Sequence, residues 1–137
     1  MNVKRLILSL IGVVLFVIAF DFLFHGIVLK NMYELTKFIW RPEPKMGAML
    51  FSQLSFSLAM GAMYVYLQRQ CDQHANTCSG CKLGVVFGVG VGLILGAVKI
   101  GSYCYLPIPL SLVISWVGLS VLKCIGVGCI LGVLYKQ

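Results

Sequence analysis

The chain has 137 residues, of which 60% are hydrophobic and 11% are charged, and its formal net charge is +7. A soluble domain carries about a quarter charged residues, because charged side chains cover a surface that faces water. This composition excludes an ordinary soluble domain and predicts an all-α integral membrane protein in contact with the lipid bilayer. The 11 Lys and Arg residues form no dense patch, so nucleic acid is not expected as a partner.

Four apolar stretches are long enough to cross a membrane as helices. A span needs roughly 20 mostly apolar residues, and residues 6–29, 46–67, 83–105 and 109–135 meet this requirement. The stretches lack the period-2 alternation of barrel strands. We therefore predict a single membrane domain, residues 1–137, built as a bundle of four transmembrane helices.

The segment between the first two stretches, residues 30–45, is predicted to contain a short amphipathic helix. Its apolar residues recur at close to helical spacing, and tyrosine and tryptophan favour the depth of the lipid headgroups. Two prolines follow Arg41 and end the helix. We expect this segment to lie in the outer membrane interface, with Tyr33, Trp40 and Arg41 as its interface residues.

Basic residues at the ends of the spans predict the orientation of the chain. Lys and Arg favour the cytoplasmic side, and Lys4 and Arg5 precede the first span. This places both termini in the cytoplasm. The two sides carry similar numbers of basic residues: Lys4, Arg5, Arg69, Lys82 and Lys136 on the side of the termini, and Lys30, Lys37, Arg41 and Lys45 on the other.

Glycines repeat every four residues in the third span and recur in the fourth. Such stripes let a neighbouring helix backbone approach closely. They favour either packing within the chain or docking against a second copy or another membrane subunit. The stripe residues are Gly84, Gly88, Gly92 and Gly96 in the third span, and Gly128 and Gly132 in the fourth.

Four ionisable residues, Asp21, His25, Lys99 and Lys123, lie within the apolar stretches. A charge at the bilayer centre costs about 2.5–3.5 kcal/mol on insertion scales, so such residues tend to face the bundle interior. Asp21 and His25 are four residues apart and share one helix face. Counted at about 1.5 Å per residue from the outer ends of the spans, Asp21 matches Lys99 in depth. Lys123, nearer the midplane, is left to snorkel or to stay neutral.

Asp21, His25 and Lys99 therefore form a candidate intramembrane polar site. It is either a proton- or ion-handling site or a polar clasp that fixes the register of the helices. The second span adds Ser52, Gln53, Ser55 and Ser57. These four do not share one helical face, so we expect them to extend the site poorly.

A cluster of cysteines and one histidine marks the second loop. The spacing Cys71-x2-His74-x3-Cys78-x2-Cys81 offers four ligands that suit tetrahedral Zn²⁺ or an iron–sulfur cluster. Two alternatives remain open. The thiols are free in a reducing cytoplasm, or they form a disulfide if the loop faces an oxidising compartment.

Several motifs occur in an order that resembles a family of small four-helix bacterial membrane proteins of unknown function. They are Asp21-x3-His25-Gly26, then Trp40-Arg41-Pro42, and then Pro107-Ile108-Pro109. The resemblance implies the four-span fold and the bacterial inner (plasma) membrane, and it implies no activity. The cysteine loop and Lys99 depart from the pattern.

Three classes of function fit these patterns. The first, which the glycine stripes favour, is an accessory subunit of a larger membrane assembly. The second is a small proton, ion or solute transporter that uses the face of Asp21 and His25. The third is a metal-binding or redox membrane protein centred on the cysteine loop. An enzyme is not expected, because the sequence has no nucleophile–base pair and no phosphate-binding loop.

Overall fold

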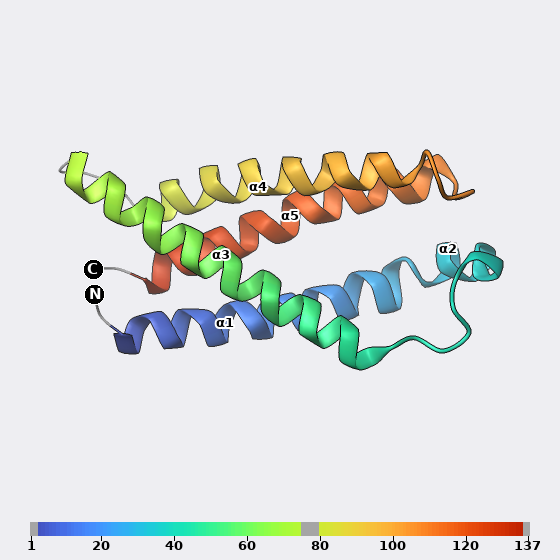
Figure 1. Cartoon of the computed structure of the whole chain (residues 1–137), viewed down its shortest axis with the longest axis horizontal. Coiled ribbons are helices and arrows are strands. Elements are labelled where there is room, and N and C mark those ends of the chain that lie inside the picture. The colour runs from blue at the N-terminus through green and yellow to red at the C-terminus, as the bar shows by residue number, and fades with distance from the viewer. Residues whose placement is uncertain (1–2, 75–79, 136–137) are drawn as a thin grey trace.

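The computed structural model describes residues 3–74 and 80–135, and every regular element within these ranges is a helix (Figure 1). Within the described ranges, four helices are long and apolar enough to span a membrane. The predicted four-helix bundle is therefore confirmed. The elements are α1 (Val3–Asp21), continued by the π-helix η1 (Phe22–Val28), then α2 (Lys30–Leu35), the 3-10 helix η2 (Lys37–Ile39), α3 (Met46–His74), α4 (Gly80–Ser102) and α5 (Leu110–Leu134).

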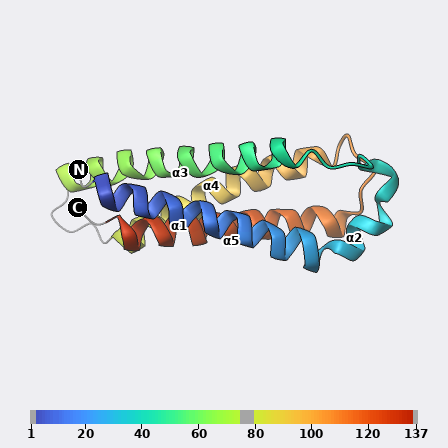
Figure 2. The same cartoon turned by 90° about the horizontal axis from the view of Figure 1, so that it is seen from below.

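The four long helices run side by side along one axis, and α3 crosses the others obliquely (Figures 1 and 2). Both chain ends lie at one end of the bundle, which we call the terminal end. The short helix α2 lies at the opposite end, which we call the α2 end. An even number of spans brings both chain ends to the same end of the bundle. A polar site near α2 is therefore far from the termini.

The glycine stripe of α4 packs against α5. A Cβ atom on Gly88 would overlap the carbonyl group of Cys124, and a Cβ on Gly92 would lie 2.6 Å from the Cα of Val121. A Cβ on Gly84 would likewise overlap the backbone of Gly128. The two helices therefore approach closely because side chains are missing. This face is covered within the chain, so it is not available for docking another subunit.

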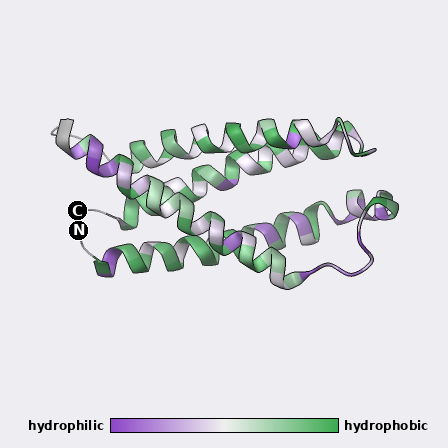
Figure 3. Cartoon of the chain, in the orientation of Figure 1, coloured by the Kyte–Doolittle hydropathy of each residue, from purple (hydrophilic) through white to green (hydrophobic). Residues whose placement is uncertain are grey.

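The outward faces of the helices are apolar. Leu15 of α1, Phe51 of α3 and Val86 of α4 expose 63%, 73% and 70% of their area, and apolar colour is prominent on α1, α4 and α5, whereas α3 is paler (Figure 3). A chain that exposes this much apolar surface needs a lipid environment. The outer surface therefore fits contact with a bilayer.

The connection between α1 and α3 contains helical turns but not a clear amphipathic helix. The helix α2 has six residues, and Leu35 just at its end is 80% exposed. Side-chain bonds hold the turn that follows, since the Thr36 hydroxyl donates to the Met32 carbonyl at 2.9 Å and accepts from Trp40 Nε1 at 2.9 Å. The segment is therefore held by the bonds of Thr36 and by packing of its other apolar residues on α5, whereas Leu35 stays exposed. The residues that pack are Met32, Tyr33, Ile39 and Trp40.

Several helix boundaries differ from the expected spans: α1 begins at Val3 rather than at residue 6, and α4 begins at Gly80 rather than at residue 83. The helix α3 continues past residue 67 to His74, because polar residues extend it by contacts one turn apart: Gln68 Nε2 donates to the Asp72 carboxylate at 2.9 Å. The helix α4 ends at Ser102 rather than at residue 105. Hydropathy marks the part of a helix that lies in lipid, not the place where its hydrogen bonds stop.

Candidate functional site

The first span changes its helix type where the polar residues begin. From Phe22 to Val28 the backbone is a π-helix, and the Leu29 amide donates to the carbonyl of Phe24, five residues earlier, at 2.8 Å. Such turns are rare and are often found at functional sites. Asp21 lies immediately before this segment and His25 lies within it.

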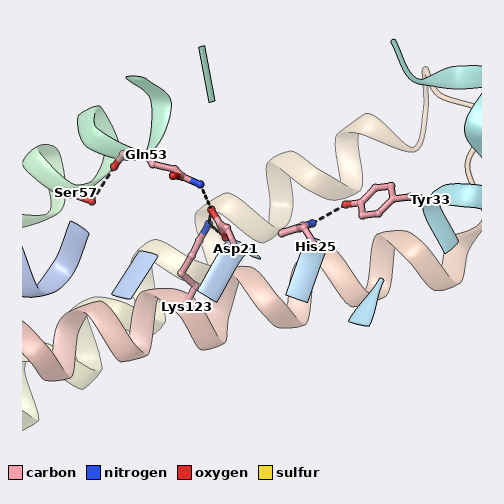
Figure 4. A network of polar contacts seen from close by, with 6 residues as sticks. All are labelled: Asp21, His25, Tyr33, Gln53, Ser57 and Lys123. Atoms are coloured by element: carbon pink, nitrogen blue, oxygen red, sulfur yellow. Dashed lines mark hydrogen bonds and ion pairs between the residues drawn. The ribbon is translucent and has the colours of Figure 1, made fainter. Parts of the chain in front are cut away.

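Asp21 forms an ion pair with Lys123 of α5. The Lys123 ammonium lies 2.9 and 3.3 Å from the two carboxylate oxygens (Figure 4). The two side chains are only 17% and 19% exposed. A second cationic contact follows, because Lys123 Nζ also lies 5.5 Å from the ring centre of Phe56. The pair therefore joins α1 to α5 inside the bundle.

The predicted match of Asp21 with Lys99 is wrong, because the ends of the helices are not level. Leu29 packs in one cluster with Leu112 and Trp116 of α5, so α5 reaches further toward the α2 end than the first span does. Asp21 lies eight residues before Leu29 in the first span. Lys123 lies 11 residues after Leu112 and seven residues after Trp116, so it reaches a similar depth in α5.

The second span contributes Gln53 and Ser57 to this network. Gln53 is 7% exposed and donates its amide to the Asp21 carboxylate at 3.1 Å, and the Ser57 hydroxyl donates to the Gln53 carbonyl at 2.8 Å (Figure 4). Ser52 and Ser55 point outward, as expected for residues on other faces. The expectation that the polar residues of this span add little is therefore wrong for Gln53. Its Oε1 atom is buried without a hydrogen-bond partner in the described part of the chain.

His25, Tyr33 and Trp116 form a second polar group beside the ion pair. Trp116 Nε1 donates to the Tyr33 hydroxyl at 2.8 Å, and the same hydroxyl lies 2.7 Å from His25 Nδ1. The indole can only donate, so the Tyr33 oxygen accepts from it and its proton remains free for neutral His25. A protonated His25 would instead donate to Tyr33. The hydrogen bond therefore persists in both protonation states of the histidine.

Burial raises the pKa of the Tyr33 phenol, and the negative charge of Asp21 adds to the rise, while the Trp116 hydrogen bond opposes it. Tyr33 therefore remains a neutral hydroxyl across the physiological pH range. It is available there as both a donor and an acceptor.

Lys99 of α4 contacts this group through Trp116. Its ammonium is 5.6 Å from the ring centre of Trp116, a cation–π distance. Within residues 3–74 and 80–135, Lys99 forms no ion pair with a carboxylate. Among the lysines of the site, Lys123 is paired and Lys99 is not.

The ion pair, the group of His25, Tyr33 and Trp116, and Lys99 line one pocket of about 250 Å³, whereas Gln53 and Ser57 are not part of its lining. This volume corresponds to roughly eight water molecules, which suits a small solute. Two ammonium groups face one carboxylate, so the pocket carries one net positive charge when His25 is neutral. The lining residues are Phe20, Asp21, His25, Tyr33, Trp40, Lys99, Trp116, Leu119, Ser120 and Lys123.

A more open cavity of about 560 Å³ lies on the α2 side of the same residues. His25, Tyr33 and Trp40 line both spaces, so they form the wall between the cavity and the pocket. Lys30, Glu34 and Lys37 complete the lining of the cavity.

The three residues of the predicted polar site thus line one pocket, but Asp21 pairs with Lys123 and not with Lys99. Asp21, His25 and Lys99 all line the pocket, and its other members were not assigned to the site from the sequence. Those that carry a polar group are Tyr33, Trp40, Trp116, Ser120 and Lys123. The sequence did indicate Tyr33 and Trp40, but as residues of the outer membrane interface. The structure turns both toward the pocket and leaves Arg41 exposed.

The predicted metal site is described only in part. Cys71 is disulfide-bonded, so its sulfur is not available as a thiolate ligand, whereas Cys81 is free and exposed. Cys78 and the side chain of His74 lie outside the described residues. In the part of the chain that the structure describes, no group of three His, Cys, Asp or Glu residues is placed to hold a metal ion.

Comparison with known proteins identifies no relative: no family model, curated protein or solved structure matches the chain. Function therefore has to be argued from the chemistry of the pocket.

Proposed function

We propose that this membrane protein is a small transporter that moves an ion or a small charged solute through the pocket of Asp21, His25, Lys99 and Lys123. One observation carries the proposal. Charged side chains from three helices converge on a single pocket within an otherwise apolar bundle. Ionisable residues inside spans are costly, and they commonly mark ion or substrate pathways.

A polar clasp that only fixes the register of the helices would need fewer charged side chains than line this pocket. The pair of Asp21 and Lys123 is sufficient to lock α1 against α5. That pair does not require a second ammonium group, Lys99, which contacts no carboxylate in the described part of the chain. The π-helix at this point supports the same proposal.

The other two functional classes have less support. The accessory-subunit hypothesis assumed that a glycine-rich helix face docks on a partner, and the glycine stripes instead pack against each other where α4 meets α5. The metal or redox hypothesis loses Cys71 as a thiolate ligand. The family resemblance remains a prediction, and the transport proposal takes no support from it.

We place the protein in the bacterial inner membrane with its termini in the cytoplasm, following Lys4 and Arg5. The pocket then lies toward the outer face, because it is close to the α2 end. The disulfide bond of Cys71 argues for the opposite orientation, since such bonds persist in oxidising compartments. Labelling of single cysteines decides between the two.

The test is charge movement across proteoliposomes adsorbed on a solid-supported membrane, driven by a step in pH or in salt concentration. The wild-type protein is expected to give a current that empty liposomes do not give. Asp21→Asn should reduce this current by about tenfold or more, because it removes the carboxylate that lines the pocket in the described part of the chain. Equal currents from the wild type and empty liposomes under every gradient would refute the proposal.

A further inference from the structure

We infer that the pocket binds a small monocarboxylate, with Lys99 as the group that receives its negative charge. This inference rests on the proposed transport site and names its substrate class. The charge of the pocket is its first support. Asp21 already neutralises Lys123 at 2.9 Å, so the pocket has one ammonium group, Lys99, without a carboxylate in the described part of the chain.

The present contact of Lys99 is one that a carboxylate can replace. Lys99 is exposed, and its ammonium lies 5.6 Å from the ring centre of Trp116 without a carboxylate partner in the described residues. A charge-assisted hydrogen bond to a carboxylate is stronger than a cation–π contact of this length. The lysine chain is flexible, so its ammonium can move onto an anion that enters the pocket.

Neutral hydrogen-bond donors stand beside this ammonium group. The hydroxyls of Tyr33 and Ser120 line the pocket together with Lys99, and a carboxylate accepts hydrogen bonds from such groups at both oxygens. The Tyr33 proton faces His25 Nδ1 when that histidine is neutral, and it is released for the anion when a protonated His25 donates to Tyr33 instead. These donors suit an anion better than a cation.

The rest of the wall is apolar and selects an organic anion. Phe20, Leu119 and the ring faces of Trp40 and Trp116 complete the lining. A volume of about 250 Å³ holds a carboxylate with a short hydrocarbon body. A fully hydrated inorganic ion would leave these apolar groups in contact with water, which is unfavourable.

The open cavity on the α2 side also has an excess positive charge, so it suits the entry of an anion. Lys30 and Lys37 line it with a single carboxylate, Glu34, which lies 3.9 Å from Lys30. An anion therefore meets one excess positive charge in the cavity and another in the pocket. The wall between them is His25, Tyr33 and Trp40.

Binding of butyrate to the full-length protein in detergent tests the inference. Both tryptophans of the chain, Trp40 and Trp116, line the pocket, so intrinsic fluorescence reports on it directly, and calorimetry gives an independent affinity. Butanol and butylammonium are the matched probes, because they differ from butyrate in charge and hardly in size. Saturable binding of butyrate, with no binding of the other two, is expected.

Three variants measure how individual charged residues affect the affinity for butyrate. Lys99→Met should weaken butyrate binding by about tenfold or more, because it removes the unpaired ammonium. Lys82→Met is the control, since it removes an exposed lysine from the far end of the same helix and should leave binding unchanged. Asp21→Asn should tighten binding by roughly fivefold, since it frees the charge of Lys123 for the anion.

The outcomes separate the inference from the transport proposal. Equal binding of butylammonium, or an unchanged butyrate affinity in Lys99→Met, overturns the inference even if the wild type carries a current. Weaker binding in Asp21→Asn also overturns it, because a merely structural role for Asp21 predicts that sign. Specific butyrate binding without any current would leave the site intact as a binding site and refute transport.

Discussion

At the scale of single residues, the bundle is organised around the ion pair of Asp21 and Lys123. The two side chains are mostly buried and lie 2.9 Å apart, and Gln53 adds a third helix to the contact. Removing one partner of a buried pair leaves an uncompensated charge, whereas removing both leaves none. Stability and function can therefore be separated at this pair.

Replacement of one or both partners tests its structural role. We expect Asp21→Leu or Lys123→Leu alone to lower the free energy of unfolding by about 3–5 kcal/mol. The double variant should return to within about 1–2 kcal/mol of the wild type, because both charges are gone. Unfolding in mixed micelles at increasing denaturant measures all three. A double variant as unstable as the two single changes combined would show that the charges do not interact.

Tyr33 offers a second test at this scale. Tyr33→Phe removes the hydroxyl that joins His25 to Trp116 and leaves the buried indole N–H without its acceptor. The expected loss is about 1–3 kcal/mol in the free energy of unfolding, together with a shift in tryptophan emission. Tyr105→Phe is the control, because Tyr105 is 87% exposed. Equal effects of the two changes would contradict the hydrogen-bonded role of Tyr33.

At the scale of elements, the pair of α4 and α5 is the tightest part of the fold, because its glycines bring two backbones together. Lipid tails are as apolar as the side chains of a span, so close packing rather than burial from water drives such an association. The π-helix at the end of the first span does not contribute close packing of this type. It places His25 and Asp21 around the pocket at the cost of regular hydrogen bonding.

Two glycines of α4 form a matched pair for testing this packing. Gly88→Ala should destabilise the protein by about 1–3 kcal/mol, since its new methyl group would overlap the backbone at Cys124. Gly90→Ala meets open space and should be neutral or stabilising by up to about 1 kcal/mol. Thermal unfolding in detergent compares them. Equal midpoints would show that α4 and α5 do not pack through this stripe.

At the scale of the whole molecule, the spans and the general place of the polar site were predictable and the details of the site were not. Hydropathy identifies four spans because each must cover its backbone with apolar side chains. Depth along one helix does not give the register between two helices, which is why Lys123 was missed. A π-helix also carries no pattern of its own, since neighbouring helices decide whether the regular bonds can shift.

Orientation in the membrane is the remaining prediction at this scale. Cys81 and Cys104 are free, exposed and at opposite ends of the bundle, whereas Cys124 is buried. If the termini are cytoplasmic, a membrane-impermeant maleimide should label Cys104 in intact cells, and Cys81 only after permeabilisation. Variants that keep one of the three cysteines allow this comparison, and Cys124 should react only after unfolding. The reverse pattern for Cys81 and Cys104 would invert the topology.

The most direct measurement of the central proposal is the current of the double variant Asp21→Leu/Lys123→Leu in proteoliposomes. The folded protein should keep the bundle and Lys99, and lose the paired charges of Asp21 and Lys123. A transport cycle that needs this pair predicts a current at the level of empty liposomes from a protein of near wild-type stability, even where Lys99 still binds the anion. A current equal to that of the wild type would show that the pair only holds the helices together.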